Sequence, residues 1–133
     1  MSFEEDLKAF AQGTRSRADA VVRGAVTLLC NSLVYRSPVD TGRFRSNWRL
    51  SRDAPLLASL DSYDKVGDAT FARLQSEIPE HPAGTVIYIM NNVYYGQYLE
   101  QGHSAQAPGE NAIVGRTVME FTGHVNTVLS GLS

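Results

Sequence analysis

The sequence contains little cysteine and no long apolar run, and both absences limit what the chain can be. Cys30 is the only cysteine among 133 residues and lies in the apolar stretch AVTLLCNSLV, so it has no partner for a disulfide within the chain. We therefore expect a buried thiol in a protein of a reducing compartment. No apolar stretch reaches the ~18 residues of a membrane-spanning helix, and the N-terminal MSFEEDLK lacks the basic start of a signal peptide. We expect a protein that is made in a cytoplasm and contacts no membrane.

Signals for metal or cofactor chemistry are missing as well. The three histidines share no metal-ligand spacing with one another or with Cys30, which argues against a zinc site at His81, His103 and His124. There is no glycine-rich phosphate loop, and no Ser–His–Asp arrangement can be assigned. His103 lies close to Glu100 in the sequence and is interpreted as a surface histidine rather than a general base. We expect no cofactor.

The composition is that of an ordinary folded protein, with 43% hydrophobic and 20% charged residues. Its length fits a single domain, which we expect over residues 1–133. Ser2 and Glu5 have the spacing of a helix capping box, and apolar residues then recur with a helical period. If this helix runs unbroken to Tyr35, it is about 50 Å long. Pro38 is expected to end it, because the residue before a proline is pushed out of helical geometry.

The segment RFRSNWRL alternates between apolar and polar residues, which predicts a half-buried strand over residues 43–50. One set of alternate side chains faces the core, namely Phe44, Ser46, Trp48 and Leu50. The other set forms a row that contains three arginines, namely Arg43, Arg45, Asn47 and Arg49. Such a row suits either nucleic acid or acidic groups on a neighbouring subunit.

Weaker patterns outline the rest of the chain. They predict a short helix at ATFARLQSEI capped by Asp68, a buried strand at TVIYIMNN, a short helical turn ended by Gly102, and a polar loop at HSAQAPGENA. A C-terminal helix carries one apolar face: Val114, Val118, Phe121, Val125, Val128 and Leu132. The fold class is therefore α+β, with a long N-terminal helix, a small antiparallel or mixed sheet, short helices and a C-terminal helix.

The tripeptide Asp40-Thr41-Gly42 allows two interpretations. Asp-Thr-Gly is the active-site signature of aspartic proteases, and AIVGRTV further along resembles a segment of the small dimeric enzymes of this class. In such a dimer the two aspartates share a proton. In the other interpretation Pro38, Asp40 and Gly42 only shape a turn, with Gly42 at positive φ. The proline before Asp40 and the long terminal helices favour the turn.

The two halves of the chain carry opposite net charge. Residues 1–52 contain nine Lys and Arg against five Asp and Glu, a net charge of +4. Residues 53–133 contain three against nine, a net charge of −6. Opposite charges of this kind suit either two solvated faces or a head-to-tail contact between copies of the chain.

Three segments taken together, SPVDTGRFRSNW, IYIMNNVYYGQYLEQGHSAQAP and VGRTVMEF, resemble the tail-completion or neck proteins of long-tailed bacteriophages. This group is similar to the minor tail protein Z of lambda-like phages. The shared pattern places a long helix before the first segment and a second helix at the C-terminus. The matching positions are Pro38, Asp40, Thr41, Gly42, Trp48, Asn91 or Asn92, Tyr95, Glu100, Gly102, His103 and Pro108.

The resemblance implies a structural, non-enzymatic protein of the virion that is made in the cytoplasm of a bacterial host. It implies a ring at the head–tail junction, usually of six subunits, that contacts the tail terminator protein and the head-completion or stopper protein. The tape measure protein or DNA in the lumen would be further contacts. Within such a ring, the side chains that we expect at a subunit interface or DNA channel are Arg43, Arg45, Arg49, Glu100 and His103.

Overall fold

The computed structural model describes residues 2–132, without the side chains of Thr122, His124 and Leu132. The class is α+β, as predicted: a long N-terminal helix, a small antiparallel sheet, several short helices and a C-terminal helix. In chain order the elements are α1 Phe3–Arg36, α2 Arg43–Ser46, β1 Trp48–Arg52, α3 Asp68–Glu77, β2 Ile87–Asn91, α4 Gly96–Glu100, β3 His103–Ser104, β4 Ala107–Pro108, α5 Val114–Met119 and α6 Phe121–Leu132.

Helix α1 is unbroken over 34 residues and begins at the predicted capping box. The Ser2 hydroxyl accepts a hydrogen bond from the Glu5 amide, and the Glu5 carboxylate accepts one from the Ser2 amide, each at 3.1 Å. At the other end Ser37 takes an extended conformation before Pro38, with φ −66° and ψ 131°, and the helix stops at Arg36. The two ends of α1 therefore follow from local sequence.

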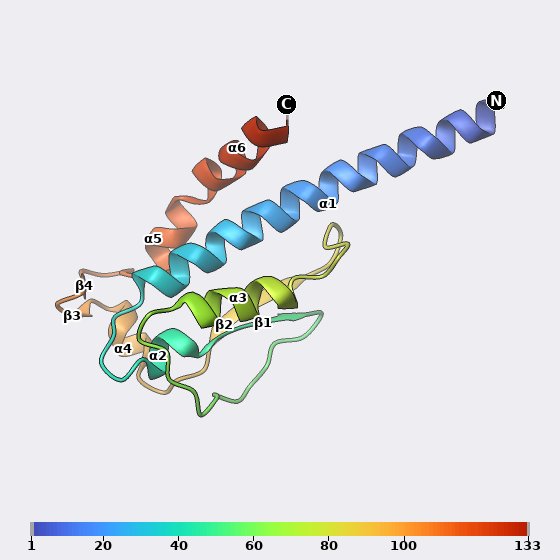
Figure 1. Ribbon diagram of the computed structural model, residues 1–133. Coiled ribbons are helices and arrows are strands. Elements are labelled where there is room, and N and C mark those ends of the chain that lie inside the picture. The colour runs from blue at the N-terminus through green and yellow to red at the C-terminus, as the bar shows by residue number, and fades with distance from the viewer. Residues whose placement is uncertain (1, 133) are drawn as a thin grey trace.

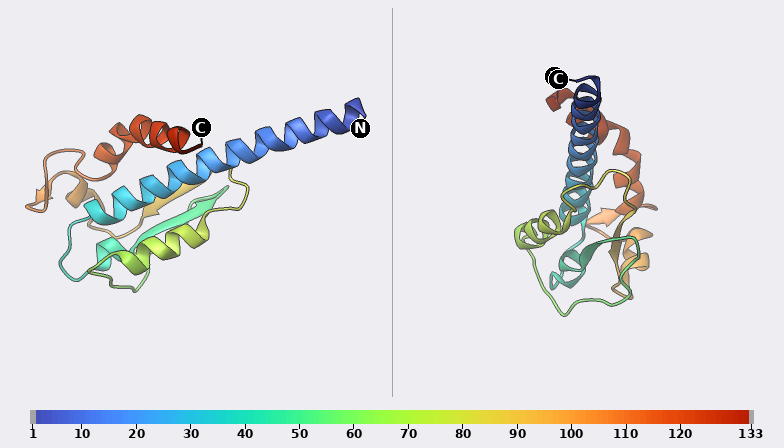
Figure 2. Two further views of the ribbon diagram at one scale, coloured as in Figure 1. Left: turned by 45° about the horizontal axis from the view of Figure 1, so that its top comes forward. Right: turned by 90° about the vertical axis from the view of Figure 1, so that its right-hand side faces the viewer.

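The C-terminal half of α1 lies between two layers (Figures 1 and 2). Helices α5 and α6 cover one side of it, and α3 with the β1–β2 sheet covers the other. Buried apolar side chains form the core, among them Cys30, Val34, Trp48, Leu74 and Ile113. The thiol of Cys30 is fully buried, as predicted, and this burial raises the pKa of the thiol to about 12.

The first half of α1 has no such cover. Residues 2–18 are exposed, and Figures 1 and 2 show this part of the helix projecting beyond every other element. The first hydrogen bond to the body is made by Asp19, whose carboxylate accepts from the Ala83 amide and faces His81 at 3.0 Å. Within residues 2–132, no helix is long and apolar enough to cross a membrane.

The predicted strand over residues 43–50 is wrong in its first half. Arg43–Ser46 forms the single helical turn α2, and only Trp48–Arg52 is a strand. Gly42 precedes the turn at φ 87°, and the amide of Ser46 donates a hydrogen bond to the carbonyl of Gly42 at 3.0 Å. Strand β1 then pairs antiparallel with β2, with Trp48 opposite Asn91 and Leu50 opposite Ile89. The strand at TVIYIMNN is confirmed as β2, but the prediction that it is buried is wrong. Every residue of Ile87–Asn91 is half-buried, because the sheet has only two strands.

Three smaller differences concern the second half of the chain. Asp68 is the first residue of α3, and Gly67 occupies the cap position. The loop HSAQAPGENA contains a two-residue ladder, β3 with β4. The C-terminal helix is divided at Glu120 into α5 and α6. Val128 packs on α1 at Gly24, whereas Val118 and Phe121 of the predicted apolar face are exposed, and Leu132 lies outside the described side chains.

Candidate functional site

The segments that carry the resemblance meet at one end of the molecule, around the turn from α1 to α2. This turn is fixed by its neighbours. The Ser37 hydroxyl donates to the Leu33 carbonyl at 2.6 Å and accepts from Trp48 Nε1 at 2.7 Å. Gly42 is at positive φ, as the turn interpretation requires, and a Cβ there would lie 2.6 Å from the backbone of Asp64. The close approach of two main chains is thus a second reason for glycine.

Phe44 and Trp48 lie in the core, where the alternating pattern placed them. Phe44 is 5% exposed and Trp48 is 3% exposed, and their rings meet edge to face with centroids 5.7 Å apart. The Asn91 side chain donates to the Phe44 carbonyl at 2.8 Å, which ties β2 to α2. Asn47 was expected in the arginine row but is fully buried, with its side-chain amide hydrogen bonded to the main chain of Arg43 and Leu60.

The three arginines do not form one row on one strand face. Arg43 and Arg45 belong to α2, and Arg49 belongs to β1. The Arg45 guanidinium donates to the carbonyls of Lys65 at 2.8 Å and Ser37 at 2.9 Å, so it links α2 to two other segments of its own chain. Arg49 donates to the Ala58 carbonyl at 2.8 Å. Of the three, Arg43 lines an open cavity.

Glu100 also acts within the chain. Its carboxylate accepts hydrogen bonds from the amides of Ile113, Val114 and Gly115 at 3.2, 2.7 and 3.0 Å. These amides open helix α5 and have no partner within the helix, so Glu100 serves as its cap from a distant part of the chain. His103 is exposed and stacks on Tyr98, with ring centroids 4.3 Å apart. His103 is therefore a surface histidine.

Gly102 lets the hairpin after α4 fold back tightly. It has φ 87°, and a Cβ added there would lie 2.2 Å from the carbonyl oxygen of Gly109. The hairpin is also joined to the α1–α2 turn by Gln106, whose side-chain amide donates to the Val39 carbonyl at 2.8 Å and accepts from the Val39 amide at 2.9 Å. The turn, α4 and the hairpin therefore form one connected cluster.

An open cavity of about 480 Å³ lies between the α1–α2 turn, α4 and the hairpin. Its walls include Asp40 and Arg43 and the aromatic rings of Tyr94, Tyr95 and Tyr98. Tyr94 is 90% exposed. Burial raises the pKa of the Tyr95 hydroxyl, and the charge of Arg43 opposes that rise. The cavity thus combines flat aromatic surface with one acidic and one basic side chain.

Asp40 itself is exposed in the loop between two helices. The aspartic protease interpretation expects this residue at the end of an apolar strand, and the structure places it elsewhere. The hydroxyl of Thr41 accepts from the Arg43 amide at 3.3 Å and so helps to form the turn. Within the described residues, no group of three or more His, Cys, Asp or Glu could hold a metal ion, and the side chain of His124 lies outside that set.

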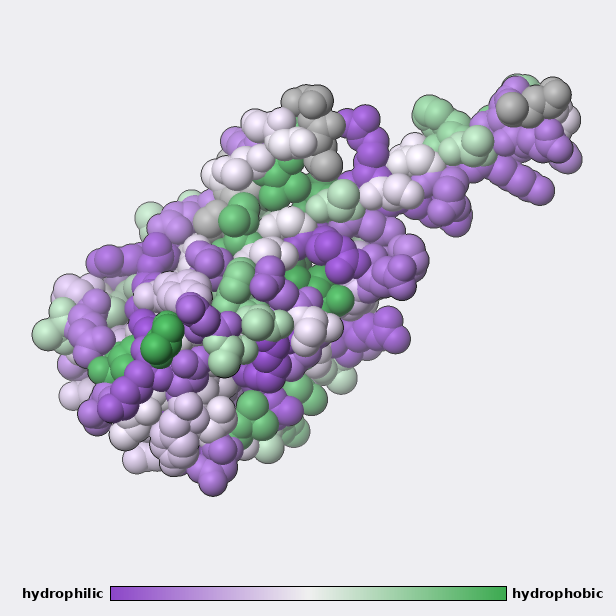
Figure 3. Space-filling view, viewed as in Figure 1, coloured by the Kyte–Doolittle hydropathy of each residue, from purple (hydrophilic) through white to green (hydrophobic). Residues whose placement is uncertain are grey.

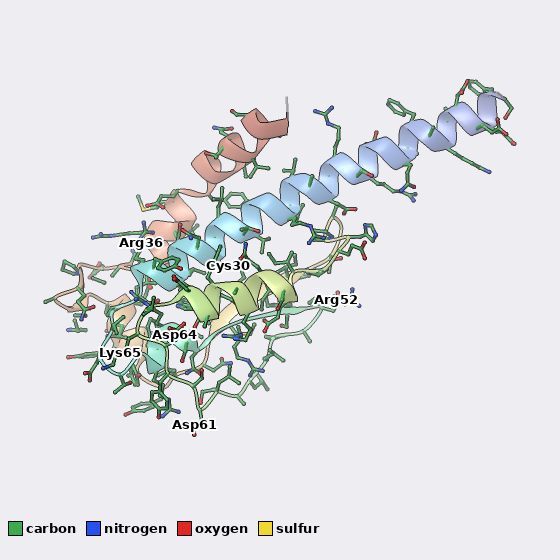
Figure 4. All side chains as sticks on the ribbon, in the orientation of Figure 1. Cys30, Arg36, Arg52, Asp61, Asp64 and Lys65 are labelled. Atoms are coloured by element: carbon green, nitrogen blue, oxygen red, sulfur yellow. The ribbon has the colours of Figure 1, made fainter. Side chains whose placement is uncertain are left out.

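Two further side chains, Asp64 and Arg73, have structural roles that the sequence did not predict. The Asp64 carboxylate accepts from the amides of Val66, Gly67 and Thr70 and from the Thr70 hydroxyl, at 2.8–3.2 Å. Figure 4 shows Asp64 beside the start of α3. Burial by itself would raise the pKa of Asp64, but these hydrogen bonds outweigh it and lower the pKa. Arg73 donates to the carbonyls of Ser46 and Trp48 at 2.9 and 2.7 Å and so fastens α3 to β1.

Comparisons of the chain with protein-family models, with curated proteins and with solved structures found no match.

Proposed function

We propose that this chain is a structural subunit of the head–tail junction of a long-tailed bacteriophage, where copies form a ring that completes the tail and joins it to the head. The observation that carries the proposal is the exposed first half of α1. It extends about 24 Å beyond the body over residues 3–18. A helix that is apolar in part and exposed along its first half suits a subunit that completes its packing in an assembly.

The order of elements gives further support. The resemblance implies a long first helix, a Pro-x-Asp-Thr-Gly turn, a Pro-containing loop and a C-terminal helix, and the chain has these elements in that order. The residues that carry the resemblance join β1 to the end of α1, β2 to α2, and α4 to α5, through Trp48–Ser37, Asn91–Phe44 and the Glu100 cap. Their roles are structural, which agrees with a non-enzymatic protein.

The opposite charges of the two halves of the chain do not define the contact that closes the ring. Arg45, Arg49 and Glu100 use their charged groups on main-chain partners within the chain. Arg43 and His103 remain at the surface beside the aromatic cavity and are the better candidates for contact with a neighbour, a stopper or terminator protein, or DNA in the lumen.

Electron microscopy and a peptidase assay test the proposal together. Negative-stain images of the purified chain are expected to show closed rings, and light scattering is expected to give a mass of about six subunits or a multiple of it. Cleavage of an unfolded protein substrate that disappears in the Asp40→Asn variant would instead favour the dimeric aspartic protease. A chain without rings and with such cleavage contradicts the structural proposal.

A further inference from the structure

The projecting part of α1 carries an apolar stripe with nothing to cover it. Phe3, Leu7 and Phe10 are 76%, 51% and 75% exposed and are spaced by four and three residues, so they lie on one face of the helix. Figure 3 shows hydrophobic patches among the hydrophilic atoms of this segment. We call residues 3–18 the projecting segment.

The stripe continues along the helix into a face that the chain itself covers. Steps of three or four residues lead from Phe10 through Thr14 and Arg17 to Val21 and Gly24. At Gly24 helix α6 packs so closely that an added Cβ would lie 2.8 Å from a methyl carbon of Val128. Helix α6 therefore covers the later part of this face, and the projecting segment presents the same face without a partner helix.

The charges of the projecting segment are separated along its length. Glu4, Glu5 and Asp6 lie in its first turn, Lys8 follows them, and Arg15 and Arg17 lie in its last turns. Among the residues that the structure describes, no ion pair joins any of these six side chains to the rest of the chain. Two such segments side by side in the same direction would place acidic turn against acidic turn. In opposite directions, they would place each acidic turn against the arginines of the other.

We propose that the projecting segment pairs with the same segment of a second copy of this chain, as two antiparallel helices. With Phe10 of each copy at the centre, Leu7 of one copy faces Gly13 of the other, where an added Cβ would meet no atom of its own chain within 4 Å. Phe3 of one copy faces Arg17 of the other. The guanidinium of that Arg17 then lies between Glu4 and Asp6 of the first copy. The contact is self-complementary, as a two-fold interface requires.

The lengths of the two segments agree with this pairing. Each copy is exposed up to Ala18, and the first hydrogen bond to the body is made by Asp19. The loop of His81 and Ala83 approaches the segment from the side of Gln12, Ser16 and Asp19, which is opposite to the apolar stripe. When Phe10 is at the centre, Ser2 of the second copy lies opposite Ala18, so the second helix matches the exposed length of the stripe.

A membrane surface is a poorer partner for the same stripe. Surface-binding helices carry a basic polar face that is attracted to anionic lipid. The projecting segment has three acidic and three basic side chains, Glu4, Glu5, Asp6, Lys8, Arg15 and Arg17, so its net charge is zero. The pairing does not depend on the proposed function, because it uses a part of the chain separate from the body and leaves the surface of the body free for other contacts.

The first test compares two variants by light scattering over a range of concentrations. Pairing of the projecting segments doubles the mass of the particle, whether the bodies are single or already joined in a ring. Phe10→Asp places two charges at the centre of the contact and is expected to raise the dissociation constant of the pair by about tenfold or more, which halves the mass. Gln12→Asp adds the same charge on the opposite face of the helix and is expected to leave the mass unchanged. Equal masses for the two variants would overturn the proposal.

The second test uses charge reversal, which also separates pairing from contact with the body. Arg15→Glu with Arg17→Glu leaves Lys8 as the one basic side chain of one segment, and Glu4→Lys with Glu5→Lys and Asp6→Lys leaves no acidic side chain in another. Each variant alone is expected to lose the pair, and a one-to-one mixture is expected to restore it at low salt and lose it as salt rises. A mixture that stays unpaired, while wild-type chains associate, would place the segment on the body of a neighbour and overturn the antiparallel pair. Unchanged Trp48 fluorescence in every variant serves as the control for folding.

Discussion

At the residue scale, Trp48 joins the end of α1 to the sheet. Its ring is buried against Phe44, and its indole nitrogen donates to Ser37. Trp48→Ala is expected to lower the free energy of unfolding by roughly 3–5 kcal/mol, because it leaves a cavity and removes the hydrogen bond that the Ser37 hydroxyl accepts. Denaturant titration measures this cost, and Trp48→Phe, which keeps most of the packing, is expected to cost less. Red-shifted fluorescence of the native protein would contradict the burial of Trp48, the only tryptophan.

Two glycines separate the effect of backbone conformation from that of close approach. Gly84 has φ 81°, with no atom within 4 Å of an added Cβ, and Gly102 has φ 87°, with the Gly109 backbone at 2.2 Å. Gly84→Ala is expected to destabilise by about 1–2 kcal/mol through conformation alone. Gly102→Ala is expected to cost about 1–3 kcal/mol more, because two chains must move apart. Equal costs in thermal or denaturant unfolding would show that the hairpin is looser than described.

Asp64 makes the free energy of unfolding depend on pH in the acidic range. Its hydrogen bonds hold the pKa of the folded state below the ordinary value of 3.8, so the stabilisation is present above that value and is lost as the pH falls through the folded pKa. We expect the free energy of unfolding to decline below about pH 4 and to decline less in Asp64→Asn. Asp61→Asn, an exposed aspartate in the same loop, is the matched control. An identical decline in Asp64→Asn and wild type would contradict this assignment.

At the element scale, α5 begins where Glu100 caps it. Glu100→Ala removes the acceptor of three main-chain amides and is expected to lower the free energy of unfolding by about 1–2 kcal/mol. Glu110→Ala changes an exposed carboxylate of the nearby loop and is expected to have little effect. A similar cost for both variants in denaturant titration would mean that the cap does not hold α5.

The elements whose ends follow from neighbouring residues could be predicted from the sequence, and those that depend on distant contacts could not. The capping box at Ser2 and the proline at position 38 act locally, and α1 has the predicted bounds within about one residue. The alternation in RFRSNWRL also suits one helical turn followed by a strand. What decides between them is tertiary: Gly42 packs against Asp64, and Arg45 reaches the carbonyl of Lys65.

The same distinction applies to the candidate site. Phe44 and Trp48 could be predicted because apolar periodicity records burial. The roles of Glu100, Asp64 and Gln106 could not, because their partners are main-chain amides and carbonyls, which have no signature in the sequence. Surface charge was the least informative signal, since Arg45 and Arg49 turned out to hold their own chain.

At the scale of the whole molecule, the body and the projecting helix have different roles. The body has a continuous core around Cys30, Trp48 and Ile113 and needs no partner to bury it. The apolar side chains Phe3, Leu7 and Phe10 of the projecting segment are exposed and would be covered in the assembly that we propose. A structural subunit of a larger particle accounts for both features.

The central claim, that the chain joins phage tails to heads, is tested most directly on particles made without it. When the gene is inactivated in a phage that encodes it, electron microscopy is expected to show filled heads and separate tails, and complementation with the wild-type chain is expected to restore joined particles. Asp40→Asn is expected to restore them equally, because the account gives this carboxylate no catalytic role. Joined, infectious particles formed without the chain would contradict the account, and restoration by wild type but not by Asp40→Asn would favour the protease.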